Sequence, residues 1–181
     1  MADQPINTCS CDSGSSCCGQ EGQTKNIQID FLYLDLNVCE RCQGAESNLD
    51  QAIHDVSAVL KAAGYEVIVN KINITSPELA IAHQFLSSPT IKINGRDIAF
   101  ELSETTCKDC GDLCGDTVDC RSWSYEGTDY SEPPKEMIVN AIMKAVYGGE
   151  SELPETSEAY VLPENLITFF NGLEKKWTNK K

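Results

Sequence analysis

Hydrophobic and polar positions along the chain follow two periods, and these periods predict the elements of the fold. The run from 27 to 36 has apolar residues on both faces, which is typical of a central strand covered on both sides. Between 46 and 64, apolar residues recur at spacings of four and three, which predicts one helical face made by Leu49, Ile53, Val56, Leu60 and Ala63. Gly44 leaves the start of this helix open, either at the preceding cysteine pair or at Ser47.

Further elements follow in the same alternation. They are a strand at 65–74, a short helix at 76–86, a hairpin at 87–101 and an amphipathic helix at 133–149. Asn94-Gly95 suits a type I′ turn in the hairpin, and a smaller hairpin is expected around Glu126-Gly127. The order strand, helix, strand, helix, strand, strand, helix predicts an α/β domain.

The two ends of the chain have a different composition. Residues 1–26 are rich in Ser, Gly, Gln and Cys without apolar periodicity, which predicts a disordered tail before a domain at 27–147. Residues 148–181 predict an acidic linker and an amphipathic helix with five large apolar residues, Leu166, Ile167, Phe169, Phe170 and Leu173. Two interpretations of this helix stay open: it docks on its own domain, or it forms a partner or dimer contact.

The charge of the chain limits its partners. Twenty-eight acidic and 14 basic residues give a net charge of −14. Such a surface repels phosphate backbones and anionic lipids, so we expect neither nucleic-acid nor membrane binding. The start of the sequence lacks the basic and apolar pattern of a signal peptide, and no run approaches the roughly 18 apolar residues of a spanning helix. We therefore expect a cytoplasmic protein.

All ten cysteines fall into three groups: Cys9, Cys11, Cys17 and Cys18 in the tail, then Cys39 and Cys42, then Cys107, Cys110, Cys114 and Cys120. A reducing cytoplasm favours metal binding or redox chemistry over structural disulfides. The grouping itself argues against incidental burial in a core.

The element order, C-x-x-C after the first strand and Ser88-Pro89-Thr90 before the third strand resemble the thioredoxin fold over roughly residues 27 to 147. This resemblance implies a βαβαββα domain with a cysteine-rich insertion (residues 102–132) before the last core helix. It also implies that Pro89 is a cis proline facing the cysteine pair.

The sequence is more closely similar to an uncharacterised family of cysteine-rich, thioredoxin-like proteins, catalogued as a domain of unknown function. The similarity rests on the V-C-E-R-C motif, the I-N-G-R hairpin and the cysteine-rich loop before the last helix. The motif departs from thioredoxin, because Glu40 and Arg41 replace Gly-Pro and no tryptophan precedes Cys39.

In a redox function, Cys39 would be the attacking thiolate and Cys42 the resolving thiol, with Pro89 forming the wall where a substrate chain docks. Peptide dipoles at a helix N-terminus favour the thiolate, and a second thiol three positions on resolves a mixed disulfide. Asp35 stands four residues before Cys39 and is either a proton shuttle or a solvated acid at the end of the strand.

The insertion should return to the same edge of the sheet as the cysteine pair, because the two strands of the preceding hairpin run in opposite directions. Its four cysteines are candidate ligands of zinc or another soft metal. A thiol relay and an iron–sulfur cluster stay open as alternatives, although the spacing differs from ferredoxin motifs. A mixed site with Cys39 and Cys42 is a further option, and it would occupy the redox pair.

The tail cysteines are candidate ligands for thiophilic ions such as Cu(I), mercury or arsenite. Two functions from different classes follow from the whole sequence. One is a cytoplasmic thiol–disulfide oxidoreductase, acting on a protein or small-molecule thiol or disulfide, with an accessory metal-binding cluster. The other is a non-enzymatic protein that binds zinc, copper, mercury or arsenite. An interaction module based on the C-terminal helix is a third.

Overall fold

The computed structural model describes residues 24–99, 101–148 and 159–178. Its central feature is a four-stranded sheet with the order β2-β1-β3-β4, in which β1 is parallel to β2 and antiparallel to β3. The strands are β1 (Lys25–Tyr33), β2 (Tyr65–Asn73), β3 (Thr90–Ile93) and β4 (Arg96–Asp97). Asn94 and Gly95 both have positive φ in the turn between β3 and β4, as a type I′ hairpin requires.

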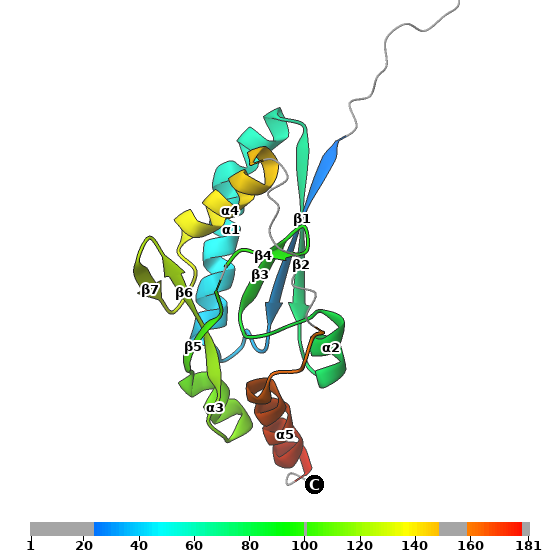
Figure 1. Ribbon diagram of the computed structural model, residues 1–181, viewed down its shortest axis with the longest axis vertical. Helices are drawn as coiled ribbons and strands as arrows, with labels where there is room; N and C mark the ends of the chain where they lie inside the picture. Colours follow the sequence, from blue (N-terminus) through cyan, green and yellow to red (C-terminus); the bar gives the residue numbers. More distant parts are fainter. Residues whose placement is uncertain (1–23, 100, 149–158, 179–181) are drawn as a thin grey trace, which may run out of the picture.

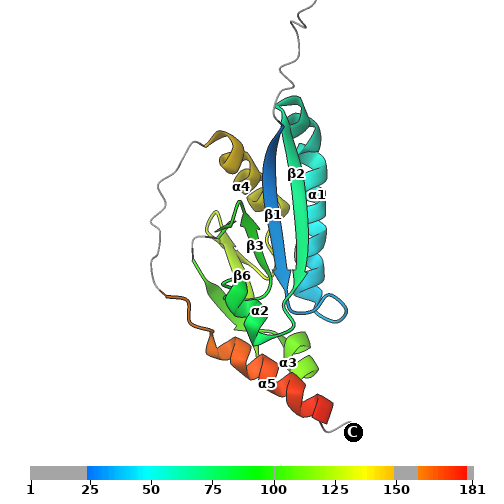
Figure 2. The ribbon, with the colours of Figure 1, turned by 90° about the vertical axis from the view of Figure 1, so that its right-hand side faces the viewer.

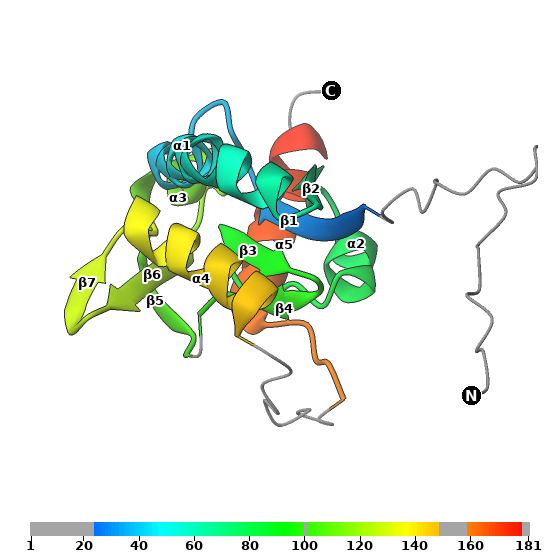
Figure 3. The ribbon, with the colours of Figure 1, turned by 90° about the horizontal axis from the view of Figure 1, so that it is seen from above.

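Two long helices cover one face of this sheet (Figures 1 and 3). They are α1 (Glu40–Ala62) and α4 (Lys135–Tyr147), while the short α2 (Pro77–Ala82) lies toward the other face. The Ser76 hydroxyl accepts a hydrogen bond from Leu79 N–H at 3.4 Å and so caps α2. The predicted order of strands and helices is therefore present, and the domain is mixed α/β.

The cysteine-rich insertion forms a second, three-stranded sheet with its own helix. It contains β5 (Ser103–Thr106), α3 (Lys108–Cys114), β6 (Asp119–Tyr125) and β7 (Thr128–Tyr130), in the sheet order β5-β6-β7. Glu126 and Gly127 have positive φ between β6 and β7, which confirms the predicted small hairpin. The insertion is thus a folded unit between β4 and α4.

The last helix, α5 (Glu164–Thr178), lies beside α3 at one end of the molecule (Figure 2). Leu166, Phe169 and Phe170 are buried against the domain, which confirms docking as the role of this helix's apolar face. Gly172 allows the close approach, because a Cβ there would lie 2.6 Å from the carbonyl oxygen of Cys114. Ile167 and Trp177 remain exposed, and a partner contact through them stays a prediction.

Buried apolar residues form two clusters, which we call the sheet core and the cysteine core. The sheet core lies between the sheet and α1 and α4, and consists mainly of Ile27, Ile29, Phe31, Ala45, Leu49, Ala52, Val56, Leu60, Ile91, Ile93, Met137, Ile138 and Ile142, with Trp123. The cysteine core combines six cysteines with Leu32, Leu34, Ile74, Ala80, Phe85, Val118, Leu166, Phe169 and Phe170. Consecutive β1 residues, Phe31 and Leu32, belong to different cores, because successive side chains of a strand point to opposite faces.

Two local expectations need correction, and one open choice is decided. The first half of β1 is covered on one face only, since Gln28 is exposed and Asp30 is half-buried and accepts a hydrogen bond from Asn70 at 2.7 Å. Helix α1 starts at the cysteine pair, one residue after Cys39, and not at Ser47.

The buried stripe of α1 also differs from the predicted one, because Ile53 is half-buried and Ala63 is exposed. The buried residues are instead Cys42, Ala45, Leu49, Ala52, Val56 and Leu60. Alanines on this face let α4 pack closely, so they replace larger residues in the stripe.

Strand β1 begins at Lys25, and the predicted tail up to residue 23 and the linker at 149–158 lie outside the described residues. The domain boundaries themselves stay predictions. Within the part of the chain that the structure describes, no helix is long and apolar enough to cross a membrane.

Candidate metal centre

Four cysteines from two separate parts of the chain meet in the cysteine core. Their Sγ atoms all lie within 4.8 Å of one another, and all four residues are buried. We call this group the thiol cluster, formed by Cys39, Cys107, Cys110 and Cys120. One member comes from the start of α1, and the other three come from α3 and β6 of the insertion.

Cys39 occupies the N-cap position of α1 in an extended conformation, with φ −82° and ψ 105°. Its side chain makes no capping hydrogen bond, so the sulfur is directed to other partners. The carboxylate of Asp109 in α3 caps the helix instead, accepting a hydrogen bond from Glu40 N–H at 2.9 Å. The insertion thus completes the first turn of α1 and places Cys39 beside its own cysteines.

The turn before Cys39 is fixed by Asp35. Its carboxylate accepts hydrogen bonds from the N–H groups of Asn37 and Val38, both at 2.7 Å. These two bonds give Asp35 a structural role at the end of the β1–α1 connection. The sequence suggested a proton shuttle or a solvated acid at Asp35, and neither interpretation included this turn.

Within the insertion, backbone hydrogen bonds set the positions of the other three cysteines. Cys107 is the N-cap of α3, and its N–H donates to Val118 O at 2.8 Å, which closes the loop around α3. Cys110 lies one helical turn further along α3. Cys120 stands opposite Thr105 in the antiparallel β5–β6 pair. All three therefore face the same interior space.

Arg41 connects α1 to the insertion beside the thiol cluster. Its guanidinium donates to the carbonyl and hydroxyl oxygens of Thr105 at 3.2 and 2.8 Å, to Thr106 O at 3.0 Å and to Cys120 O at 3.3 Å. The planar fork of arginine suits several acceptors at once. The side chain fixes β5 and β6 in place and brings a positive charge near the cysteines.

Helix α5 holds the insertion from the other side. The side-chain amide of Asn165 accepts from Asp119 N–H at 2.9 Å and donates to Asp119 O at 2.6 Å. Lys176 donates to Asp112 O near the end of α3 at 2.6 Å. These hydrogen bonds join α5 to Asp119, the residue before Cys120, and to Asp112 near the end of α3. Helix α5 therefore restrains the segments that carry the three insertion cysteines.

Cys42 lies next to the thiol cluster but outside it. Its Sγ is 3.3 Å from the hydroxyl of Ser88, the residue joined to Pro89 by a cis peptide bond. Ser88 Oγ also accepts a hydrogen bond from Leu34 N–H at 3.1 Å. The segment around Pro89 therefore lies against the second cysteine of the C-x-x-C motif.

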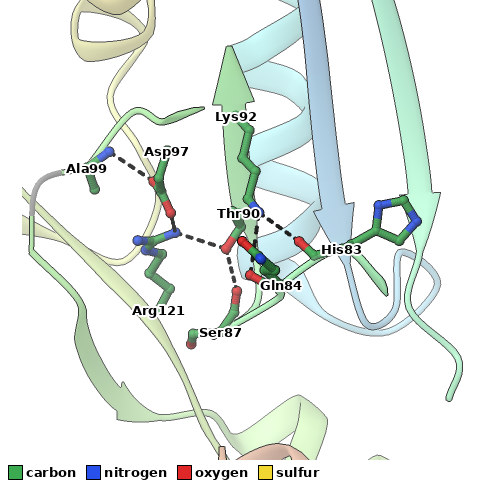
Figure 4. Close-up of polar contacts among 8 residues, drawn as sticks. All are labelled: His83, Gln84, Ser87, Thr90, Lys92, Asp97, Ala99 and Arg121. Carbon is green, nitrogen blue, oxygen red and sulfur yellow. Dashed lines mark hydrogen bonds and ion pairs between the residues drawn. The ribbon is translucent and has the colours of Figure 1, made fainter. Parts of the chain in front are cut away.

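Strand β6 covers this segment. Arg121 N–H donates to Ser88 O at 2.7 Å, so the backbone next to Cys120 pairs with the residue before Pro89. The side chain of Arg121, which is only 2% exposed, extends to Asp97 at 2.7 Å and to the Thr90 hydroxyl at 2.8 Å (Figure 4). Its guanidinium also lies over the ring of Trp123 at 4.8 Å. The insertion is thereby attached to β3 and β4.

Hydrogen bonds among the sulfurs set the protonation of the cluster. The pKa of Cys39 lies far below its ordinary value because its sulfur accepts hydrogen bonds from Cys107, Cys110 and Cys120. Bonds from Cys110 and Cys120 lower the pKa of Cys107 to about 7. The pKa values of Cys110 and Cys120 are instead raised, in each case mainly by the hydrogen bond to Cys107. Of the four thiols, Cys39 is the one whose surroundings most favour the thiolate.

Cys42 behaves differently from its neighbour. Its pKa is raised, first by its hydrogen bond to Cys39 and then by burial. Its surroundings thus favour the protonated thiol, in contrast to those of Cys39.

The sulfur positions suit one tetrahedral ion. Zn–S bonds of about 2.3 Å place tetrahedral sulfurs about 3.8 Å apart, and Cys110 and Cys120 are already 3.4 Å apart. A disulfide needs an S–S separation near 2.05 Å, and all six core cysteines are free. Shifts of at most about 1 Å in the sulfur–sulfur separations, some shorter and some longer, would bring the four sulfurs to tetrahedral positions around an ion.

The structure brings together some of the predicted site residues and separates others. Cys107, Cys110 and Cys120 meet as expected at the edge that carries the C-x-x-C pair, but the fourth member of the cluster is Cys39. Cys114 lies outside the cluster, with its Sγ 3.7 Å from Gly111 O and 3.8 Å from Asp116 O. Cys9, Cys11, Cys17 and Cys18 lie outside the described residues, so their metal binding stays a prediction.

Sequence reasoning missed the residues that assemble the site. Asp109 caps a distant helix, and Asn165 brackets β6 from the last helix, and no local pattern signals either role. Arg41 stands out in the sequence only as a departure from the Gly-Pro of thioredoxin, whereas in the structure it bonds to the backbone of the insertion.

Comparison with known proteins gives one family. A family model described as "Domain of unknown function (DUF2703)" matches residues 27–142, which includes all but the first two residues of the sheet, the insertion and all four members of the thiol cluster. Neither the curated proteins nor the solved structures contain a match.

Proposed function

The chain belongs to the DUF2703 family, a domain of unknown function, and we propose that it is a soft-metal-binding protein whose thiol cluster holds one ion. The observation that carries this proposal is the meeting of four buried Sγ atoms within 4.8 Å of one another. Buried thiols that serve only as small apolar residues have no reason to gather from two helix starts and a strand. Thiolates on all sides of one point are the arrangement that a soft cation stabilises.

The ligand set indicates the class of ion. Four sulfur ligands in a tetrahedron suit zinc, and other thiophilic ions such as Cu(I) or mercury compete for the same donors. An iron–sulfur cluster places several irons and sulfides between its thiolates, and sulfurs within 4.8 Å of one another leave room for a single ion. Zinc is therefore the ion that we propose.

The environment favours retention of the ion over metal catalysis. Catalytic zinc sites keep one position for water or substrate, whereas four protein ligands close the coordination sphere. A divalent ion with four thiolates leaves a net charge of about −2, and Arg41 lies close by with its guanidinium bonded to Cys120 O. The proposed role is thus to hold an ion and, through it, to join the insertion to α1.

Titration of metal-free protein with Co²⁺ and then Zn²⁺ tests this proposal. Cobalt bound by four thiolates gives strong sulfur-to-metal charge-transfer absorption, and zinc should displace it at one equivalent per cluster. Cys39→Ser should weaken binding by more than about 100-fold, because it removes one ligand. Cys114→Ser is the matched control and should bind as the wild type does. Equal binding by the two variants would contradict the proposed ligand set.

A second candidate is thiol–disulfide exchange by a thioredoxin-like domain. The specific observation in its favour is the C-x-x-C motif at the start of α1 beside the cis Ser88–Pro89 bond, in a sheet of order β2-β1-β3-β4. A cytoplasmic location and a thiol or disulfide substrate would belong to this function. Two observations make thiol–disulfide exchange the less favoured function. Cys39 is fully buried, and the Ser88 carbonyl next to the pair already accepts a hydrogen bond from Arg121 N–H.

Turnover with an oxidised peptide and with oxidised glutathione distinguishes the candidates. Exchange that depends on Cys39 in zinc-loaded protein would favour the oxidoreductase. Exchange that appears only after zinc removal would support a site whose thiols are occupied by the ion.

A further inference from the structure

Cys42 is a fifth thiol at the proposed metal site that has no place in the coordination sphere. It is fully buried in the first turn of α1, three positions after Cys39, and Ser88 Oγ contacts its sulfur at 3.3 Å. A thiol in this position neither binds the ion nor packs as a plain apolar residue. Cys39 is the cluster member nearest to it along the chain, in the same helix turn.

We propose that oxidation joins Cys39 and Cys42 in a disulfide and thereby releases the bound ion, so that the site holds metal only under reducing conditions. This inference rests on the proposed function. It assigns to the C-x-x-C motif a regulatory role at the metal site, in place of exchange with an external substrate. Cys39 is the element shared by the two states, as a ligand in one and half of a disulfide in the other.

The oxidant class is a hydroperoxide, ROOH. The Cys39 sulfur attacks the outer oxygen, the O–O bond breaks, and the alkoxide takes the Cys42 proton to leave as ROH. The Cys42 sulfur then attacks the Cys39 sulfenic acid, an S–S bond forms, and hydroxide leaves and takes one proton from solvent to become water. Two electrons pass from the two sulfurs to the peroxide. The sulfur of Cys39 loses its negative charge and its bond to the ion.

The pairing with Cys42 is favoured over disulfides within the thiol cluster by geometry. A disulfide between two cluster members needs both ligands of a closed site to be withdrawn from the ion, whereas Cys42 is already free beside Cys39. The two residues also stand three positions apart at the start of one helix, where the second thiol resolves an oxidised first thiol quickly. Only one ligand then has to move.

Cys39 is fully buried, so an oxidant has to pass Cys107 to reach it. The cluster comes nearest to the surface at Cys107, which is 3% exposed and lines a shallow depression together with Lys108, Gly111 and Asp116. The buried setting excludes larger oxidants such as proteins. A hydroperoxide of few atoms is therefore the class that fits.

The test uses full-length, zinc-loaded protein treated with hydrogen peroxide, with released zinc followed by a chromogenic chelator and disulfides mapped by mass spectrometry. The wild type should release one zinc per cluster together with a Cys39–Cys42 disulfide, and a thiol reductant should restore binding. Cys42→Ser should bind zinc normally and release it roughly tenfold more slowly. Cys114→Ser, which removes another buried non-ligand thiol, should release it at the wild-type rate.

Equal release rates for wild type and Cys42→Ser would overturn the proposal, as would a mapped disulfide between members of the thiol cluster. Cys42→Ala serves as a second variant if the serine hydroxyl disturbs the contact with Ser88. A protein that never binds zinc would instead defeat the proposed function, so the two failures are separate.

Discussion

The sheet core and the cysteine core are similar in burial but differ in what holds them together. In the sheet core, aliphatic side chains of α1 and α4 pack on β1 and β3, and no thiol takes part. In the cysteine core, six cysteines lie among leucines and phenylalanines, and its backbone comes from short elements, with four residues in β5 and seven in α3. Short elements bury little apolar area, so this region needs other links.

The difference shows how one chain combines two sources of stability. Apolar burial is sufficient for the sheet core, because each side chain removed from water contributes roughly 1.5–3 kcal/mol. The insertion depends on specific polar contacts, from Arg41, Asp109, Asn165 and Arg121, and on the proposed ion. Each experiment below separates the two regions.

Removal of the ion should have the largest effect. A chelator should lower the free energy of unfolding of the zinc-loaded protein by at least about 4 kcal/mol, the stabilisation expected from a ligand at a thousand times its Kd. The loss should begin in the insertion. Trp123 lies in β6 and is buried in the sheet core, so its fluorescence reports whether the insertion separates from the sheet, and Trp177→Phe removes the exposed second tryptophan.

Readdition of zinc is the control for this experiment and should restore the fluorescence and the melting temperature. Unchanged melting after complete metal removal would mean that the cysteine core is as self-sufficient as the sheet core.

Leu49→Ala should damage the sheet core alone. Leu49 is fully buried in α1, and truncation of such a side chain costs about 3 kcal/mol. Chemical denaturation should show this loss, whereas the zinc affinity of the folded protein should stay within about twofold of the wild type, because additivity holds for separated sites. The control is Val59→Ala on the exposed side of the same helix, with an effect within about 0.5 kcal/mol.

Arg41→Ala should act on the link between the regions. It removes hydrogen bonds from a charged group to three residues of the insertion, at an expected cost of about 2 kcal/mol in unfolding free energy. Zinc binding, measured by competition with a chromogenic chelator, should weaken by about tenfold. Arg41→Lys should recover only part of the loss, since an ammonium group lacks the planar fork. Full recovery by lysine would mean that charge alone matters.

Asn165→Ala should have the smallest effect. It should lower the free energy of unfolding by about 1 kcal/mol, because two hydrogen bonds to the Asp119 backbone are lost. Hydrogen exchange at the Asp119 amide measures it directly, and that amide should exchange faster in the variant. Asn171→Ala, on the exposed side of α5, should leave the exchange rate unchanged. Similar rates in both variants would show that α5 does not restrain β6.

The sheet region could be predicted from the sequence because its information is local. Periodicity placed α1, α4 and the strands, and Asn94-Gly95 placed the hairpin turn, since a type I′ turn requires positive φ at both residues. The predictions were wrong where tertiary contacts determine which residues are buried. The open face of β1 depends on which side α1 and α4 cover, and a list of apolar positions in one strand does not contain that information.

The mixed site left open from the sequence includes Cys39, but the choice between Cys39 and Cys114 could not be predicted, for a similar reason. In α3, Cys110 has Cys107 three positions before it and Cys114 four positions after it, and both spacings place neighbours on one helix face. Sequence spacing therefore treats Cys107 and Cys114 alike. The packing of α5 through Gly172 against Cys114, and the capping of α1 by Asp109, determine that Cys39 takes the fourth place.

The central claim is that one ion is held jointly by Cys39 and the insertion. Anomalous diffraction at the zinc absorption edge, from crystals of the zinc-loaded protein, tests it most directly. The account predicts a single strong peak in the cysteine core with four sulfurs at about 2.3 Å, from Cys39, Cys107, Cys110 and Cys120. A peak coordinated by Cys114 or by tail cysteines in place of Cys39 would contradict it.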